Sequence, residues 1–432
     1  MTALLHPPSV PPATPGRRIW LRVGTLLDGA STTPIRDAHV VYDARTILFV
    51  GHGGATPPAG LLPPGQTAPD ASLPDATLLP GLIEAHAHFF LEGGELDAGK
   101  RAAYLQQTPA KLLELARQRL LPLVRFGIAG VRDAGDKDGV GLALSREYQS
   151  AGHPTMPYVE SPGAAIHHRG RYGTFMADAL ENYASPHACV EARVKAGADR
   201  IKLIPTGIIN FKQGAVTSEP QMKTEEVTAL VTAARAFQRQ TFAHASGDSG
   251  IQRAIDGGVD SVEHGFFIRD DQLALLRDRQ IAWVPTFAPV QRQIDHAKIM
   301  GWDQTIVGNL QRIVDNHAAS LVKGHQSGVM IVAGSDAGSY AVAHGTGFLY
   351  ELELMERAGM PAIAIINAAT GMSAARLRYK EKLGRVGVGY RSRFIVAHHS
   401  PLQTVKNLGR QRTIVFDDEV HETDETFDAT GL

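Results

Sequence analysis

The segment LIEAHAHFF, residues 82–90, contains two histidines within a short apolar stretch. Its length and composition are typical of a buried strand. Side chains two positions apart on a strand point to the same side, so His86 and His88 are expected on one face, with Ala85 and Ala87 on the other. Taken alone, such a pair is more often two polar residues at a strand end than a metal site. The other strand-like segments decide between these interpretations.

Seven further apolar segments follow, separated by amphipathic stretches. In residues 110–127 and 225–240, apolar positions recur every three or four residues, which predicts helices. The predicted strands are LIEAHAHFF (82–90), IAGVRDAG (128–135), MPYVESPG (156–163), RIKLIPTG (200–207), QTFAHAS (240–246), DSVEHG (260–265), IAWVPTF (281–287) and VMIVAGSDAG (329–338). Such alternation over residues 78–377 predicts a (β/α)₈ TIM-like barrel of class α/β, whose reactive side chains come from the C-terminal ends of its strands.

Both ends of the chain contain short β-like segments. IWLRVGTLLDG and HVVYDARTILFVG lie near the N-terminus, and RFIVAHHSPL and QRTIVFDDEV near the C-terminus. They predict a small β-sandwich domain assembled from residues 16–77 and 378–432. Residues 53–78, rich in Pro, Gly, Ala and Asp, are expected to form a loop. Residues 1–15 are expected to be a disordered tail.

Composition limits the classes of function. Among 432 residues, 43 basic and 44 acidic side chains nearly cancel and no long basic run occurs, so neither nucleic acid nor an anionic membrane surface is an expected partner. No stretch approaches the roughly 20 apolar residues of a membrane span, and the N-terminus lacks the pattern of a signal peptide. The single cysteine, Cys189, excludes an intrachain disulfide and a thiolate cluster. We therefore expect a cytoplasmic protein that acts on a small molecule.

Lys202 lies in the fourth predicted strand between Ile201 and Leu203, so its side chain is expected to face the barrel interior. An isolated buried ammonium is costly. In one interpretation the lysine pairs with an interior carboxylate. In the other, CO₂ carbamylates its amine and turns it into a carboxylate able to bridge two cations. The residues alone leave both open.

Three more residues of metal-ligand type end predicted strands: His244 in QTFAHAS, His264 in DSVEHG and Asp336 in VAGSDAG. Each has an ordinary structural interpretation, as a hydrogen-bonded core histidine or as a helix N-cap. Their occurrence at the mouths of successive strands, together with His86 and His88, instead indicates one interior metal centre.

The segments LLPGLIEAHAHFF, AHAS, VEHG and AGSDAG, with the strand-four lysine, resemble the amidohydrolase superfamily in order and strand position. Residues 351–377 are similar to its imidazolonepropionase-like and Xaa-Pro dipeptidase-like branch. The resemblance implies a centre of two divalent ions. Its ligands would be His86, His88 and Asp336 for the more buried ion, His244 and His264 for the more exposed ion, and carbamylated Lys202 between them.

The resemblance also implies a metal-dependent hydrolase that cleaves a C–N bond. A hydroxide bridging the ions would attack the amide carbonyl, Asp336 would act as general base and then acid, and His264 would help to orient the carbonyl oxygen. Nitrogen and oxygen ligands favour Zn²⁺, with Mn²⁺, Co²⁺ or Fe²⁺ as alternatives. A homo-oligomer is expected.

Substrate contacts are predicted in the loops. SPGAAIHHRGRYG, residues 161–173, contains His167, His168, Arg169 and Arg171, and we predict that one of these groups binds a substrate carboxylate or carbonyl; a solvated basic loop is the alternative. Phe211 and other aromatic residues near strand ends predict an apolar pocket for an acyl- or aromatic-substituted amide. Dipeptide-cleaving relatives often have a tyrosine after the strand-four lysine, whereas IPTGIINFKQG has none.

Two alternatives remain. A mononuclear deaminase or cyclic amidohydrolase of the same superfamily would not need Lys202 as a ligand. A non-catalytic barrel scaffold would be expected to have lost ligands, yet all six positions are filled.

Overall fold

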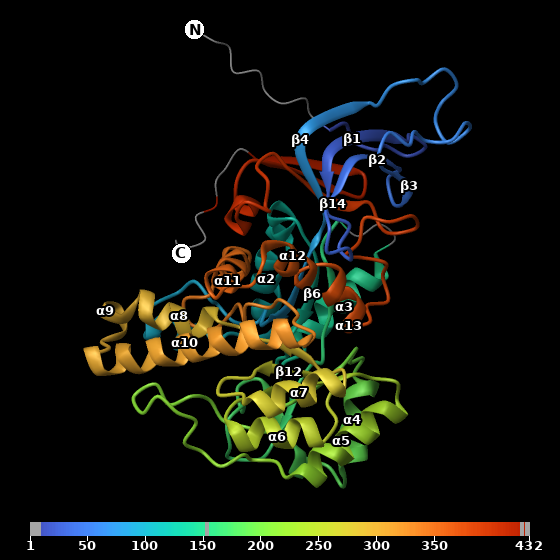
Figure 1. The fold of residues 1–432 in the computed structure, drawn as a ribbon. Helices are drawn as coiled ribbons and strands as arrows, with labels where there is room; N and C mark the ends of the chain where they lie inside the picture. The colour runs from blue at the N-terminus through green and yellow to red at the C-terminus, as the bar shows by residue number, and fades with distance from the viewer. Residues whose placement is uncertain (1–9, 152–154, 424–426, 428–432) are drawn as a thin grey trace.

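The computed structural model describes residues 10–151, 155–423 and 427. It contains a small β-domain at one end and a larger α/β part (Figure 1). The β-domain is one seven-stranded sheet of order β16-β15-β14-β4-β1-β2-β3. Its strands are β1 (Ile19–Leu26), β2 (Ile35–Tyr42), β3 (Ile47–Gly51), β4 (Ala71–Pro80), β14 (Arg393–Ala397), β15 (Arg412–Phe416) and β16 (Glu419–Thr423).

Strand β4 joins the two ends of the chain. One edge pairs in parallel with β1, and the other pairs antiparallel with β14. Because β4 pairs with both groups of strands, the seven strands form one hydrogen-bonded sheet, and the two-sheet sandwich stays a prediction. The predicted loop 53–78 is wrong from Ala71 onward. Pro74 obscured the strand, but it lies opposite Gly24 where the register with β1 shifts, and such irregularities tolerate proline.

The structure describes only part of the predicted N-terminal tail. Of the tail predicted over residues 1–15, residues 1–9 lie outside the described part. Val10 and Ala13 are buried and pack in the core of the β-domain. Residues 10–15 therefore include part of that core.

The remaining strands belong to two parallel sheets, β5-β6-β7 and β13-β12-β11-β10-β8-β9. Their bounds are β5 (Leu82–Ala87), β6 (Ile128–Asp133), β7 (Tyr158–Glu160), β8 (Ala165–His167), β9 (Ala177–Ala179), β10 (Ile201–Leu203), β11 (Thr241–Ala245), β12 (Ser261–His264) and β13 (Ala282–Val284). All but β8 and β9 begin within a segment that the sequence predicts as a strand.

Residues 330–337 connect the two sheets on one side. The amide of Val332 donates to the carbonyl of Trp283 in β13, and the amide of Ala85 in β5 donates to the carbonyl of Ala333. On the other side, β7 pairs with β6, and β8, which follows it closely in the chain, pairs with β10. Within each sheet the pairing follows the chain order of a (β/α)₈ barrel, except that β9 lies at the edge beside β8, and among the described residues no strand pairing joins β7 to β8.

Helices cover the parallel strands. They are α1 (Ala98–Tyr104), α2 (Pro109–Leu120), α3 (Val140–Ser150), α4 (Pro186–Lys195), α5 (Thr224–Ala236), α6 (Asp248–Asp256), α7 (Asp270–Asp278), α8 (Ala288–Asp295), α9 (Ala297–Met300), α10 (Gln304–Ser327), α11 (Thr346–Arg357), α12 (Ala362–Ala368) and α13 (Gly371–Arg376). Three 3₁₀ helices are η1 (Leu121–Phe126), η2 (Leu180–Asn182) and η3 (Val405–Gly409). Within the described ranges, no helix is both long and apolar enough to cross a membrane.

Arg393 of β14 forms a buried ion pair within the β-domain and also links this domain to the α/β part. The guanidinium of Arg393 lies 2.7 Å from Asp417 Oδ2 and also donates to the carbonyls of Ala129 and Met156. We expect Asp417→Asn to lower the free energy of unfolding by about 3 kcal/mol, because a buried guanidinium loses its charged partner. Chemical denaturation measures this loss. In the matched control, Asp37→Asn, the substituted residue also has a positive φ but pairs at the surface, and its effect should be much smaller. Equal losses would contradict this role.

Candidate metal centre

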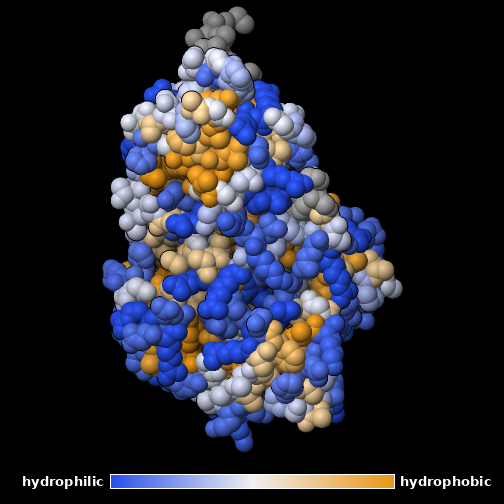
Figure 2. Space-filling view, turned by 90° about the vertical axis from the view of Figure 1, so that its right-hand side faces the viewer, coloured by the Kyte–Doolittle hydropathy of each residue, from blue (hydrophilic) through white to orange (hydrophobic). Residues whose placement is uncertain are grey.

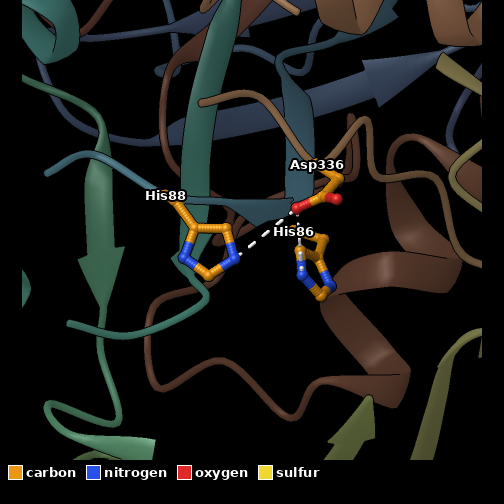
Figure 3. A group of neighbouring side chains, drawn as sticks. All are labelled: His86, His88 and Asp336. Atoms are coloured by element: carbon orange, nitrogen blue, oxygen red, sulfur yellow. Dashed lines mark ion pairs between the residues drawn. The ribbon is translucent and has the colours of Figure 1, made fainter. Parts of the chain in front are cut away.

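His86, His88 and Asp336 converge on one point (Figure 3). The Nε2 atoms of both histidines lie 3.5 Å from Asp336 Oδ1. The two histidines lie at the C-terminal end of β5 and just beyond it. The amide of Asp336 donates to the carbonyl of His86, and φ of Asp336 is +58°. All three side chains are buried, as a candidate metal-binding group at the strand ends of a barrel should be.

Lys202 joins this group from β10. Its Nζ lies 3.5 Å from His86 Nε2 and 4.7 Å from the centre of the Phe242 ring. Burial lowers its pKa to about 8, although the carboxylates of Glu263 and Asp336 oppose that shift. Among the described residues, no carboxylate forms an ion pair with Nζ. The structure therefore does not support the interpretation in which Lys202 pairs with an interior carboxylate.

His244 and His264 complete the predicted set. Their ring centres are 4.5 Å apart, and the rings of His264 and His86 are 5.1 Å apart. The structure thus brings all six predicted ligands into one cluster at the ends of β5, β10, β11, β12 and the segment that contains Asp336. Burial lowers the pKa of both His88 and His244 to about 3, so these imidazoles are neutral, which is the form that binds metals.

One ring nitrogen of each histidine is already held by another group. His86 Nδ1 bonds with Glu263 at 2.6 Å, and His88 Nδ1 bonds with the carbonyl of Gly135 at 3.1 Å. His264 Nδ1 bonds with the Thr286 hydroxyl at 2.7 Å, and His244 Nε2 with the carbonyl of Gly207 at 3.3 Å. These outer partners occupy Nδ1 of three rings and Nε2 of the fourth, whereas His86 Nε2 contacts Lys202 Nζ at 3.5 Å within the cluster. This pattern of outer partners is typical of metal-bound histidines.

Glu263 is a further candidate site residue that the sequence interpretation missed. Its Oε2 contacts both His86 Nδ1 and Arg132 Nη2 at 2.6 Å, and its Oε1 accepts from Ser261. The register aligns Glu263 with His244 on the neighbouring strand, which puts both on the same face. The alternation of side chains along the strand could have identified Glu263, but the adjacent His264 was assigned as the site residue of this segment.

We expect Glu263→Gln to weaken metal binding by about 10- to 100-fold, because His86 loses the carboxylate that fixes its ring and tautomer. Titration against a competing chelator measures the affinity. Glu160→Gln is the matched control, since Glu160 is also buried and paired with an arginine, Arg200, but contacts no ligand candidate. An equal loss in both variants would show a general effect on folding instead.

A cavity of about 230 Å³ opens above the cluster. Its walls contain His88, Lys202, His244, His264 and Asp336 at the base. The apolar part includes Leu91, Phe175, Ile209, Phe211, Phe266 and Val290. The ligand candidates thus face a small, mainly apolar space, which is the ordinary setting of a small-molecule site.

Of the predicted substrate contacts, only Phe211 lines this cavity. His168 instead lies between Glu181, 2.7 Å from Nδ1, and Glu226, 3.2 Å from Nε2. The guanidinium of Arg171 is exposed and donates to the carbonyl of Glu219. His167 is buried, and the register of β8 with β10 puts it on the same face as Lys202, but it does not line the cavity. Acidic partners distant in sequence account for the position of His168.

The match to a known protein family agrees with this geometry. Residues 77–418 match the family model described as "Amidohydrolase family". This chain belongs to the amidohydrolase family. The resemblance inferred from the sequence is confirmed, and the chain is a hydrolase that acts on C–N bonds.

Individual proteins that are similar to this chain agree with this family. The ochratoxinase of Aspergillus niger is 25% identical over 426 residues, covering 92% of this chain and 85% of the relative. The imidazolonepropionase of Pseudomonas aeruginosa is 30% identical over 153 residues, covering 30% of this chain and 36% of the relative. The solved structure of a Xaa-Pro dipeptidase with bound methionine is 26% identical, with a TM-score of 0.78 and coverage of 94% and 100%.

Proposed function

We propose that this amidohydrolase cleaves the amide bond of a small, acyl- or aromatic-substituted substrate with the help of two divalent metal ions. The observation that carries the proposal is the cluster of six ligand candidates, of which all but His86 line the cavity, with one ring nitrogen of each histidine hydrogen-bonded to an outer partner. The similarity to a Xaa-Pro dipeptidase supports an amide as the bond cleaved.

The donor set fits such ions. Neutral imidazole nitrogens and a carboxylate suit Zn²⁺ first, with Mn²⁺, Co²⁺ or Fe²⁺ as alternatives. His86, His88 and Asp336 would hold one ion, His244 and His264 the other, and Lys202 would contribute to both. When bound, such cations lower the pKa of water and polarise a carbonyl oxygen as Lewis acids.

Lys202 can contribute to both only as its carbamate. The lowered pKa makes the neutral amine accessible near neutral pH, and that form attacks CO₂. A bond forms between Nζ and the carbon of CO₂, and the amine releases a proton to solvent. The product is an anion in place of a cation. An anion suits the position of the Lys202 side chain, which lies close to His86 and has no carboxylate partner among the described residues.

Asp336 is the proposed general base and acid. The Ser339 hydroxyl donates to its Oδ2 at 2.8 Å, so Oδ1 is left to face His86 and His88. Burial raises the pKa of this carboxyl in the metal-free chain. In the proposed centre the carboxylate would accept a proton from the attacking water and pass it to the leaving nitrogen. His264, which also lines the cavity, is proposed to help orient the substrate carbonyl.

A hydrolysis screen tests the substrate class. The metal-loaded protein would be assayed with N-acyl amino acids, dipeptides, anilides, lactones and cyclic ureas. We expect turnover of open-chain amides. Turnover confined to cyclic ureas would favour the cyclic amidohydrolase alternative and contradict the proposal.

We also propose that the chain divides into two domains, one formed by residues 16–77 together with 378–432 and the other by residues 78–377.

We further propose that the chain forms a homo-oligomer. Hydrophobic residues gather on one side of the small β-domain, whereas the larger part is mostly hydrophilic in the same view (Figure 2). Exposed apolar patches often mark protein–protein contacts. Light scattering coupled to size-exclusion chromatography measures the mass, and a mass of one chain would contradict the oligomer.

A further inference from the structure

The end of the barrel opposite the metal centre contains a second cavity, of about 650 Å³. It adjoins the N-terminal ends of β11, β12 and β13, where Gln240, Asp260 and Ala282 line it. His244 and His264 lie toward the C-terminal ends of β11 and β12, and the two cavities share no lining residue. The volume is sufficient for a small molecule. The proposed hydrolysis does not use this space.

Side chains that donate hydrogen bonds dominate the lining of the second cavity. The described lining residues include five arginines and three glutamines but one carboxylate, that of Asp260; the donors are Arg235, Arg239, Arg279, Arg376, Arg378, Gln238, Gln240 and Gln280. Asp260 Oδ2 accepts from the amide and the hydroxyl of Thr241, at 2.8 and 3.1 Å. Because basic and acidic side chains nearly cancel over the whole chain, this is a local concentration of positive charge. Helix α13, which ends at Arg376, lies on the side that faces the viewer in Figure 2, where the larger part of the molecule is mostly hydrophilic.

Three of the arginines are held in place by the backbone. Arg235, Arg239 and Arg279 each donate to a carbonyl, at 2.7–2.9 Å. Such contacts are typical of arginines that cap helix ends. A neutral carbonyl does not cancel the charge, however, and each guanidinium keeps further N–H groups for a ligand. Among the described residues, Arg279 is the one of the three that pairs with a carboxylate, that of Asp256 at 3.2 Å.

Arg376 and Arg378 have no carboxylate partner in the described part of the chain. Arg376 is half-buried at the end of α13, and Arg378 is exposed. Glu381, the acidic residue nearest to them in sequence, lies 3.5 Å from Arg391 instead. The charges of these two guanidinium groups are therefore available to an anion that enters the cavity.

The balance of charge indicates the class of that anion. The C-terminal ends of α5, α6 and α7 meet at this cavity, and each opposes an anion like about half a negative charge. Together with Asp256 and Asp260, they leave about one to two of the arginine charges unbalanced. A phosphate monoester, with a second pKa of about 6, carries about two negative charges near neutral pH and accepts several hydrogen bonds from guanidinium groups. Its charge matches this remainder, whereas the charge of a polyphosphate exceeds it.

We propose that the second cavity binds a phosphate monoester, whose phosphate group receives hydrogen bonds from the five arginines of the wall. The cavity is larger than a phosphate ion requires. Val259 and Ile281 in its wall offer an apolar contact for the organic substituent.

Calorimetry with phenyl phosphate tests this proposal. We expect the metal-loaded protein to show a binding event that persists after the metal is removed, because the site lies at the other end of the barrel. The diester methyl phenyl phosphate, which has one charge fewer, should bind about tenfold more weakly. Inorganic phosphate, which lacks the substituent, should bind about threefold more weakly. Loss of all binding with the metal, or equal affinity for the monoester and either of the other two compounds, would overturn the proposal.

Variants locate the event that does not depend on metal. Arg376→Gln combined with Arg378→Gln should weaken it at least about tenfold, and Arg235→Gln, an independent variant, about threefold. Arg312→Gln is the matched control and should leave the affinity unchanged, because Arg312 is also exposed and bonds with the side chain of Asn309 but lines neither cavity.

Lys202→Ala separates the second cavity from the first. On the metal-free protein, this variant should bind phenyl phosphate with the affinity of the unaltered chain, because Lys202 lines the first cavity and not the second. An affinity that depends on Lys202, or one that neither the double variant nor Arg235→Gln changes, would contradict the proposed site.

Discussion

Asp336→Asn is expected to lower kcat/KM for an amide substrate by about 10³-fold or more. The substitution keeps the size of the side chain but removes the carboxylate that faces His86 and His88, both as a ligand and as the proton acceptor. Steady-state kinetics of the metal-loaded protein measures the effect, and metal analysis shows how much of it follows from lost metal.

The control for this variant is Asp178→Asn. Asp178 lies in β9, bonded to Tyr183 and close to Arg193, and it does not line the cavity. We expect its kcat/KM to stay near that of the unaltered chain. Survival of every activity in Asp336→Asn would leave the non-catalytic scaffold as the better explanation.

Lys202→Ala is expected to reduce the metal content from two ions per chain to one or fewer and to lower kcat/KM by about 10²-fold. The reason is that, in the proposed centre, Lys202 would contribute a bridging anion, and it could do so only after carbamylation. Elemental analysis of the dialysed protein measures the metal, and mass spectrometry of the intact chain under native conditions measures the added CO₂.

Lys195→Ala is the matched control, because Lys195 is exposed and pairs only with Glu191 one helical turn away. Its metal content should equal that of the unaltered chain. One ion per chain in both the unaltered protein and Lys202→Ala would favour the mononuclear alternative.

Seven of the eight predicted barrel strands coincide with strands of the structure because burial leaves a direct mark on sequence, whereas residues 329–338 form only isolated bridges and β8 and β9 were not predicted. Short apolar segments separated by amphipathic stretches have few other solutions in a chain of this length. The alternation of side chains also predicted that Lys202 would face inward and that His86 and His88 would share a face, and the distances agree. Strand β4 was missed since its proline is tolerated only through a register shift that depends on Gly24 of another strand.

His264 shows where alternation fails. The register aligns it with Ala245 rather than with His244, so regular alternation would turn it away from the other histidines. Its φ of +66° redirects the side chain at the end of β12, and its ring lies 4.5 Å from that of His244. Such strained backbone at a site is supported by tertiary contacts, here by Trp283, whose Nε1 donates to the carbonyl of His264. These contacts are not visible in the local sequence.

The substrate contacts predicted in the loop after the third strand stay a prediction, because His167, His168 and Arg171 do not line the cavity. The basic residues of this loop are close in sequence, and without knowledge of their partners they resembled a binding site for an anion. Glu181 and Glu226 come from η2 and α5, and they occupy His168. The charge of a loop therefore predicted little until the folded chain showed which charges were already paired.

The central claim is that hydrolysis depends on metal held by this cluster. The most direct measurement is elemental analysis and amide hydrolysis on the same sample, before chelation, after chelation and after titration with Zn²⁺. We predict that activity disappears with the metal and returns in proportion to the ions restored, reaching its maximum at two per chain. Undiminished hydrolysis by protein stripped of metal would contradict the account.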